Sequence, residues 1–323
     1  MHRIGILDDY LNVATACADW SSLTPECAVT AFTEHLGEEI EAVRRLRDFD
    51  ILVAMSERMA FPAALFEKLP NLKLLVSTKM DNPAIDLDAA RARGVPVCGT
   101  GMISAASEQA WALIMAIVRA VPRENAVMHA GGWQGGLSHS LYKKTLGILG
   151  LGMLGRRVAK VGQAFGMRVI AWSQNLTPET CEKRGVVYVD KDALFRESDV
   201  LSLQVRLSER TAGIVGAREL SLMKPTAYLI NTARGELVDE AALLDALRNN
   251  RIAGAGLDVY PIEPLPADHP LRKLDNVILT GHMGYVTEEN YRYCYAQAVE
   301  DIQAWLDGTP IRVMTEGAGW EAA

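Results

Sequence analysis

The sequence has few of the features that indicate membranes, nucleic acids or secretion. Among its 323 residues, no apolar stretch approaches the roughly 20 residues of a membrane span, and no run of Lys or Arg exceeds two. The formal charge of −7 disfavours nucleic acid and anionic membrane surfaces as partners. Residues 1–7 show no signal-peptide pattern. We therefore expect a cytoplasmic protein whose partners are small molecules.

Cysteine is scarce and shows no ligand pattern. The chain has no CxxC pair and no Cys/His spacing suited to zinc. Its five cysteines are widely separated: Cys17, Cys27, Cys98, Cys181 and Cys294. We expect free thiols and no metal site. Internal repeats of fixed period and low-complexity segments are absent as well.

What is present is an alternation of short apolar strands with helical stretches, which is typical of parallel βαβ units. The first series has strands near residues 3–7, 51–54, 72–77 and 95–97, with helices at 61–68 and 86–93 between them. A long helix is expected over 104–128. The second series has strands near 146–149, 168–171, 200–203, 227–230, 254–257 and 277–280, and a helix over 288–306 follows. Two α/β domains are expected.

A glycine motif opens the second series directly after its first strand. Gly150, Gly152 and Gly155 form Gly-x-Gly-x-x-Gly, with Met153 and Leu154 at the start of the following helix. Such a turn lets pyrophosphate approach the backbone, and the helix N-terminus supplies N–H donors. The alternative is an ordinary glycine-rich turn. With a strand before it and a helix after it, the motif predicts dinucleotide binding.

The residues expected near the ribose are compatible with either type of nicotinamide dinucleotide. No carboxylate stands where an acidic residue would hold the ribose 2′-hydroxyl, because the next strand ends in Ser173, Gln174 and Asn175. Ser173 and Gln174 could donate to a hydroxyl or to a phosphate. Arg206 is a candidate phosphate partner, although a solvated arginine explains it equally well. We predict NAD(H) or NADP(H), with a slight preference for NADP(H).

Three ionisable side chains follow three successive predicted strands. Arg234, Glu263 and His282 each lie among turn-forming residues after an apolar run. The carboxyl ends of parallel strands line the ligand crevice of an open sheet, so the three can converge on one pocket. A guanidinium, a carboxylate and an imidazole together can hold an anionic substrate and move a proton.

The order of these motifs resembles the D-isomer-specific 2-hydroxyacid dehydrogenases, which include glyoxylate/hydroxypyruvate reductases and phosphoglycerate dehydrogenase. The resemblance covers nearly the whole chain and is carried by residues 145–155, 207–211, 223–235, 257–259, 263–266 and 276–282. It implies a split substrate domain, residues 1–100 plus 288–323, into which an NAD(P)-binding Rossmann domain, residues 101–287, is inserted. It also implies an active site in the cleft between them and a homodimer.

The family roles implied for the trio agree with their chemistry. His282 would exchange a proton with the substrate oxygen, Glu263 would hold the imidazole, and Arg234 would bind the substrate carboxylate. The resemblance further implies cofactor contacts for three residues, of which the last would accept from the nicotinamide carboxamide: Thr232, Ala233 and Asp258.

The first domain is expected to contribute weaker substrate contacts. Arg58 stands where relatives carry an arginine facing substrate, whereas Ser56 replaces a frequent arginine. Lys79 replaces a usual glycine in a carboxylate-binding loop that also contains Met80, so it adds bulk and positive charge.

Two further departures lie near the predicted chemistry. Gln204 stands where histidine is frequent, and Gly281 replaces the proline that usually precedes the catalytic histidine. The function predicted is NAD(P)H-dependent reduction of a small 2-oxo acid, such as glyoxylate or hydroxypyruvate. The alternative is a dinucleotide-sensing, corepressor-like protein with little turnover. A formate-dehydrogenase-like activity is disfavoured, since the histidine's partner there is glutamine and here it is Glu263.

Overall fold

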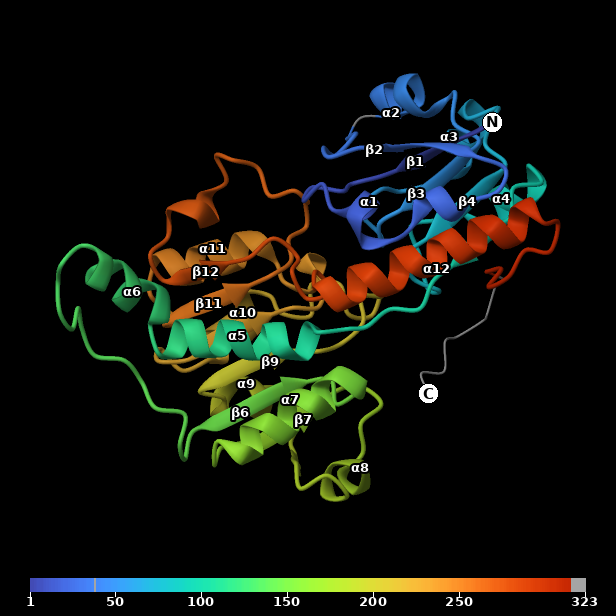
Figure 1. Ribbon diagram of the computed structural model, residues 1–323. Coiled ribbons are helices and arrows are strands. Elements are labelled where there is room, and N and C mark those ends of the chain that lie inside the picture. The colour runs from blue at the N-terminus through green and yellow to red at the C-terminus, as the bar shows by residue number, and fades with distance from the viewer. Residues whose placement is uncertain (38, 315–323) are drawn as a thin grey trace. The chain divides into compact units, whose positions relative to one another are not determined.

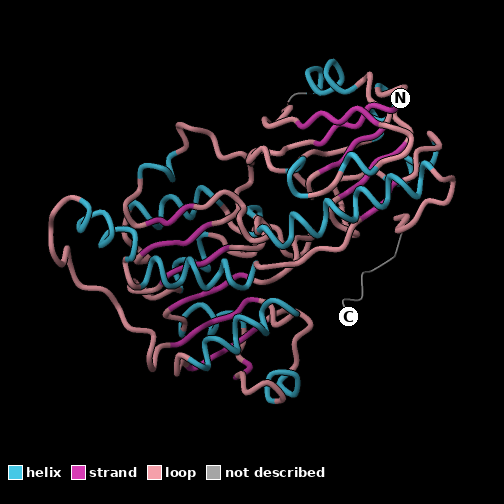
Figure 2. The backbone as a smooth tube through the Cα atoms, in the orientation of Figure 1, coloured by secondary structure: helices cyan, strands magenta, loops and turns pink. Residues whose placement is uncertain are grey.

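The computed structural model describes residues 1–37 and 39–314, and the chain forms two compact units. The first unit combines Met1–Ile103 with the chain from Val286 onward, and the second is Ser104–Tyr285. The last nine residues of the predicted substrate domain, 315–323, lie outside the described residues. Each unit is a parallel sheet flanked by helices (Figures 1 and 2). The predicted fold class, two doubly wound α/β domains with one inserted into the other, is confirmed.

The first unit contains a five-stranded sheet in the order β2-β1-β3-β4-β5. Its strands are β1 (His2–Ile6), β2 (Cys27–Ala31), β3 (Ile51–Ala54), β4 (Leu74–Ser77) and β5 (Val97–Gly99). The connections contain α1 (Ala14–Cys17), η1 (Trp20–Ser22), α2 (Glu39–Leu46), α3 (Ala63–Lys68) and α4 (Leu87–Ala92). The strand order reverses between β1 and β3. The loops after these two strands therefore border the point at which open α/β sheets bind ligands.

Helices cover both faces of the first sheet. Leu46, Phe66 and Ala90, from α2, α3 and α4, are buried in the core of one face. The last helix, α12 (Glu288–Leu306), contacts β4, β5 and α1. Beyond α12 the chain returns to β5, where the Arg312 carbonyl accepts from Gly99 N–H at 3.0 Å. The two ends of the sequence thus build one unit.

The second unit contains a seven-stranded parallel sheet in the order β12-β11-β10-β9-β6-β7-β8. Its strands are β6 (Thr145–Leu149), β7 (Arg168–Trp172), β8 (Val187–Tyr188), β9 (Val200–Leu203), β10 (Tyr228–Asn231), β11 (Gly254–Leu257) and β12 (Val277–Leu279). The helices are α5 (Ala106–Val118), α6 (Val121–His129), α7 (Met153–Ala164), α8 (Pro178–Glu182), α9 (Lys191–Glu197), α10 (Ala217–Leu222) and α11 (Glu240–Arg248), with short turns η2 (Gly235–Leu237) and η3 (Pro270–Lys273). Here the strand order reverses between β6 and β9.

Two apolar layers enclose this second sheet. Ile114 of α5 and Val158 of α7 are buried on one face, and Phe195 of α9 and Leu243 of α11 are buried on the other. Because both faces are covered, the central strands are continuous apolar runs. Such runs can be predicted from the sequence. Across the parts of the chain that the structure describes, every helix is too short or too polar to span a lipid bilayer.

One predicted helix was wrong, and two strands were not predicted. The helix expected over 104–128 is two helices, α5 and α6, separated at Ala120, whose φ of +52° is left-handed. Pro122 explains the break, because a proline inside a helix removes an N–H donor and clashes with the carbonyl four residues earlier. Strands β2 and β8 were missed because they are edge strands whose residues are partly or fully exposed, without a continuous apolar run.

Candidate active site

The three predicted catalytic residues follow three adjacent strands of the second sheet. Arg234 lies beyond β10, Glu263 in the loop after β11, and His282 beyond β12. These strands are neighbours in the order β12-β11-β10 and run parallel. All three segments therefore leave the same edge of the sheet.

His282 and Glu263 are in direct contact. The distance from His282 Nδ1 to Glu263 Oε2 is 2.7 Å, and Glu263 Oε1 accepts from the backbone N–H of Tyr260 at 2.9 Å. A carboxylate only accepts hydrogen bonds, so Nδ1 carries the proton of this contact. The second ring nitrogen, Nε2, is then the atom that can take up or release a proton. The imidazole also meets the edge of the Tyr285 ring, with centroids 5.2 Å apart.

The backbone of His282 adopts a conformation that is uncommon for residues other than glycine. Its φ is +55°, in the left-handed region. Its N–H donates to the Asp258 carbonyl at 2.7 Å, which fixes the turn after β12 to the end of β11. Strained backbone of this kind persists where the surrounding structure holds it, and such places cluster at functional sites.

Asp258 clamps this turn with its side chain. Its carboxylate is fully buried and accepts from Thr280 Oγ1 at 2.5 Å, Met283 N–H at 2.8 Å and Gly284 N–H at 3.0 Å. Gln109 Nε2 lies 3.3 Å from the same carboxylate. Burial raises the pKa of Asp258 above its ordinary value, while the hydrogen bonds from Thr280, Met283 and Gly284 and the nearby imidazole act in the opposite direction. Asp258 thus holds the turn that carries His282, and the nicotinamide contact predicted for it would be additional to these bonds.

Arg234 lies in a turn shaped by Asn231. The Asn231 side chain accepts from Ala233 N–H at 3.1 Å and donates to the Arg234 carbonyl at 2.8 Å. A Cβ atom on Gly235 would lie 2.1 Å from the Tyr260 carbonyl carbon, so only glycine allows this turn to approach the Tyr260 backbone. The Arg234 turn therefore packs against the loop that carries Glu263.

The predicted dinucleotide turn lies where the strand order of the second sheet reverses. Gly150 has a φ of +99°, and a Cβ on Gly155 would lie 2.0 Å from the Gly150 carbonyl oxygen. Gly152 caps the N-terminus of α7, and a Cβ there would meet no atom within 4 Å. This open space above exposed N–H groups fits a pyrophosphate at the helix N-terminus.

The other predicted cofactor residues differ in their contacts and in their exposure. Trp172, at the end of β7, accepts from Gly150 N–H at 2.9 Å, so Ser173 and Gln174 follow directly beside the glycine turn. Thr232 Oγ1 accepts from Gln204 Nε2 at 3.3 Å. Exposed or half-buried positions are taken by the rest: Met153, Leu154, Arg206 and Ala233. These residues fit a nicotinamide dinucleotide, and the described ranges contain no group of three His, Cys, Asp or Glu side chains suited to a metal ion.

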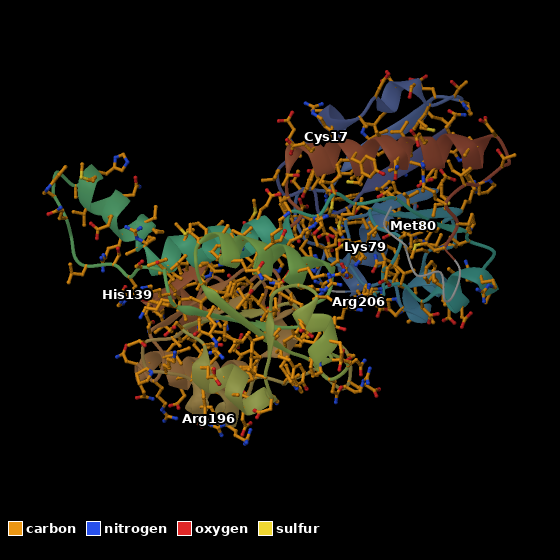
Figure 3. The ribbon with its side chains drawn as sticks, turned by 90° about the horizontal axis from the view of Figure 1, so that it is seen from below. Cys17, Lys79, Met80, His139, Arg196 and Arg206 are labelled. Atoms are coloured by element: carbon orange, nitrogen blue, oxygen red, sulfur yellow. The ribbon has the colours of Figure 1, made fainter. Side chains whose placement is uncertain are left out.

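The substrate residues predicted in the first domain lie in the first unit, whereas the trio lies in the second. Arg58 Nη1 donates to the Asp8 carbonyl at 2.7 Å, and its guanidinium lies 4.5 Å from the centroid of the Tyr10 ring. Lys79 and Met80 follow β4 and are labelled in Figure 3. Within the first unit, Arg58 contacts Asp8 and Tyr10, and Lys79 contacts Glu57; within the second, His282 contacts Glu263.

Sequence reasoning missed the residues that hold the site in shape. Tyr260 bonds Glu263 through its N–H, and its hydroxyl lies within 3.1 Å of the Leu257 and Thr280 carbonyls. Asp8 and Tyr10, which hold Arg58, were missed as well. A usable signal was present, because polar residues directly after buried strands at the carboxyl edge of a sheet often support a site.

Fold and site geometry together define a dinucleotide-dependent α/β oxidoreductase. A family profile described as "D-isomer specific 2-hydroxyacid dehydrogenase, NAD binding domain" matches residues 111–284. A glyoxylate reductase of Thermococcus litoralis is 38% identical over 258 residues, covering 76% of this chain and 77% of the relative. A hydroxypyruvate reductase of Blautia hydrogenotrophica is 32% identical over 327 residues, covering 97% and 100%.

A solved structure agrees with these sequence matches. The phosphoglycerate oxidoreductase of Vibrio cholerae has a TM-score of 0.90 and 35% identity, covering 96% of this chain and all of its own. The chain therefore belongs to the D-isomer-specific 2-hydroxyacid dehydrogenase family. It is an NAD(P)-dependent dehydrogenase.

Proposed function

We propose that this enzyme reduces a small 2-oxo acid, such as glyoxylate or hydroxypyruvate, to the D-2-hydroxy acid, with His282 as the general acid. The single observation that carries the proposal is the 2.7 Å contact between His282 Nδ1 and Glu263 Oε2. It orients the imidazole and leaves Nε2 for the substrate oxygen.

The remaining residues of the site have supporting roles. Arg234 binds the substrate carboxylate, because its planar guanidinium matches a carboxylate with two parallel hydrogen bonds. His282 Nε2 then gives its proton to the carbonyl oxygen, and in the reverse direction it takes the proton from the alcohol. A nicotinamide dinucleotide supplies or accepts the hydride when bound. Gly150, Gly152 and the start of α7 would hold its pyrophosphate, and Arg58, Lys79 and Met80 are proposed to contact the substrate.

The test is a spectrophotometric screen of 2-oxo acids with NADH and NADPH, run on the wild type and on His282→Ala. We expect the wild type to turn over glyoxylate or hydroxypyruvate, and His282→Ala to lose about a hundredfold to ten-thousandfold in kcat. Dinucleotide affinity, measured by fluorescence titration, should stay unchanged. If no 2-oxo acid oxidises either cofactor, the dehydrogenase proposal for these substrates fails and a dinucleotide-sensing role is favoured.

For the cofactor we propose a slight preference for NADP(H). The turn after β7 offers Ser173 and Gln174 as donors and has no acidic residue that would repel a 2′-phosphate. The same screen measures this preference. A more than tenfold preference for NADH, equivalent to about 1.4 kcal/mol, would contradict it.

We also propose that the enzyme is a homodimer. The segment after α5 extends away from the sheet of its unit (Figure 1), and none of the residues of α6 is buried. Large apolar side chains are exposed along it: Val121, Met128, Trp133, Leu137 and Tyr142. An exposed apolar set of this size is typical of an interface. Light scattering after size exclusion should give about twice the 35.3 kDa of one chain.

A further inference from the structure

The loops that follow β3 and β4 form one surface at the carboxyl edge of the first sheet. Strands β3 and β4 are paired in parallel, and their last residues, Ala54 and Ser77, lie opposite each other. The β3 loop also borders the point where the strand order reverses. Ligands of open α/β sheets bind at such an edge, so charges on these two loops act on whatever binds there.

The two loops are joined by an ion pair that is mostly buried. Lys79 Nζ lies 2.7 Å from Glu57 Oε1, and the two side chains are 15% and 19% exposed. The other carboxylate oxygen, Glu57 Oε2, accepts from Ser56 Oγ at 2.5 Å. Both oxygens of Glu57 are therefore engaged, and the Lys79 ammonium is held toward the β3 loop.

A set of hydrogen bonds keeps this pair in place. Ser56 N–H donates to Thr78 Oγ1 at 2.8 Å, and Asn82 Nδ2 donates to the Ser56 carbonyl at 2.7 Å and to Ser77 Oγ at 3.0 Å. Ser56 itself has a left-handed φ of +51°. Because the backbone on both sides is bonded, the charges meet at a defined place and the pair is not a mobile surface contact.

This pairing bears on which 2-oxo acid the enzyme accepts. A lysine in this loop would by itself attract a second anionic group on the substrate, such as a carboxylate or a phosphate. With Glu57 beside it, the net charge of the pair is zero. The relatives named above differ in this respect, since glyoxylate has one anionic group and phosphoglycerate carries a phosphate besides its carboxylate.

We propose that the Glu57–Lys79 pair is a specificity device that restricts the enzyme to 2-oxo acids with a single anionic group. Glu57 cancels the attraction that Lys79 would exert on a second one. The inference rests on the proposed reduction of a 2-oxo acid, and it makes Glu57 a residue that acts on the substrate through Lys79.

The test compares two substrates of equal chain length, 2-oxovalerate and 2-oxoglutarate, which differ by one carboxylate. We measure kcat/KM for both in the wild type, Glu57→Gln, Lys79→Met and the double variant; competitive inhibition of glyoxylate reduction replaces turnover where turnover is slow. Glu57→Gln keeps the size, and its amide oxygen can still accept from Lys79, but it removes the negative charge. We define the ratio as kcat/KM for 2-oxoglutarate divided by kcat/KM for 2-oxovalerate. This substitution should raise the ratio by about tenfold, mainly through the KM for 2-oxoglutarate.

The other variants make the prediction directional. Lys79→Met removes the positive charge of the pair and keeps the negative one, so it should shift the ratio away from 2-oxoglutarate, and the double variant should return near the wild-type ratio. Glu41→Gln in α2 is the matched control. Glu41 pairs with Arg44 at 2.6 Å at an exposed position, so this substitution changes the net charge equally and should not change the ratio. Thermal unfolding shows that each variant is folded.

The outcomes separate this inference from the function beneath it. If the wild type reduces 2-oxo acids but the ratio stays within about twofold in both Glu57→Gln and Lys79→Met, the specificity device is wrong and the proposed function stands. If the wild type reduces no 2-oxo acid with either cofactor, the proposed function is wrong, and the inference falls with it.

Discussion

Two buried aspartates, one in each unit, are held in different ways. Asp258 in the second unit is fully buried, and several neutral donors surround its carboxylate. Asp301 in the first unit is equally buried, but its partner is one charged side chain, with Oδ1 2.8 Å from Arg312 Nε. Its second oxygen, Oδ2, has no hydrogen-bond partner among the residues that the structure describes.

The difference shows what a buried carboxylate contributes to each region. Burial raises the pKa of Asp301 to about 7, with Arg312 acting against that rise. Asp258, with its larger set of donors, shapes the turn that carries His282. Asp301 holds the segment around Arg312, whose carbonyl accepts from Gly99 N–H of β5. We therefore expect changes at Asp258 to affect activity and stability together, and changes at Asp301 to affect stability alone.

Asp258→Ala should have the largest effect. It removes the acceptor of Thr280, Met283 and Gly284, so buried donors lose their partners and the turn around His282 loosens. We expect a loss of about 3 kcal/mol in the free energy of unfolding, together with a large fall in kcat. Urea unfolding and steady-state kinetics measure the two effects. Full activity in a destabilised variant would show that Asp258 does not position the site.

Arg312→Met should have an intermediate effect, confined to stability. It leaves Asp301 buried without its cation, and we expect a loss of about 2 kcal/mol at pH 8. The loss should be smaller at pH 5, where Asp301 can become protonated instead. Urea unfolding at the two pH values measures it, and unchanged kcat/KM distinguishes it from Asp258→Ala. An equal loss at both pH values would contradict this view of Asp301.

Asp301→Asn should have the smallest effect and change mainly the pH dependence of stability. Burial raises the pKa of Asp301 in the folded state to about 7, above its ordinary value of 3.8, so between these values the folded state binds more protons than the unfolded state. This group's contribution to stability is therefore fully present below about pH 4 and is lost as the pH rises through about 7. Asp301→Asn should reduce the change of the free energy of unfolding with pH, measured by urea unfolding between pH 5 and 8. The control is Asp88→Asn, which removes the same charge at an exposed position where Asp88 pairs with Arg91.

The comparison also shows what the sequence could predict. The buried strands were predictable because both faces of each sheet are covered, and the trio was predictable because each residue follows such a strand in a recognisable motif. The donors of Asp258 come from Gln109, Thr280 and Gly284, which the fold alone brings together. The Glu57–Lys79 pair joins two different strand ends in the same way. Contacts between distant segments leave no local pattern, so sequence reasoning reached the candidate chemistry and missed its supports.

The left-handed backbone of His282 has a consequence for evolution. Glycine adopts a φ near +55° at no steric cost, whereas a residue with a side chain is less favourable in this backbone conformation. The backbone alone would therefore favour a residue without an imidazole at this position. Natural selection for activity, working against the preference of the backbone, is what would keep histidine there, and a lineage released from that selection should lose this residue early.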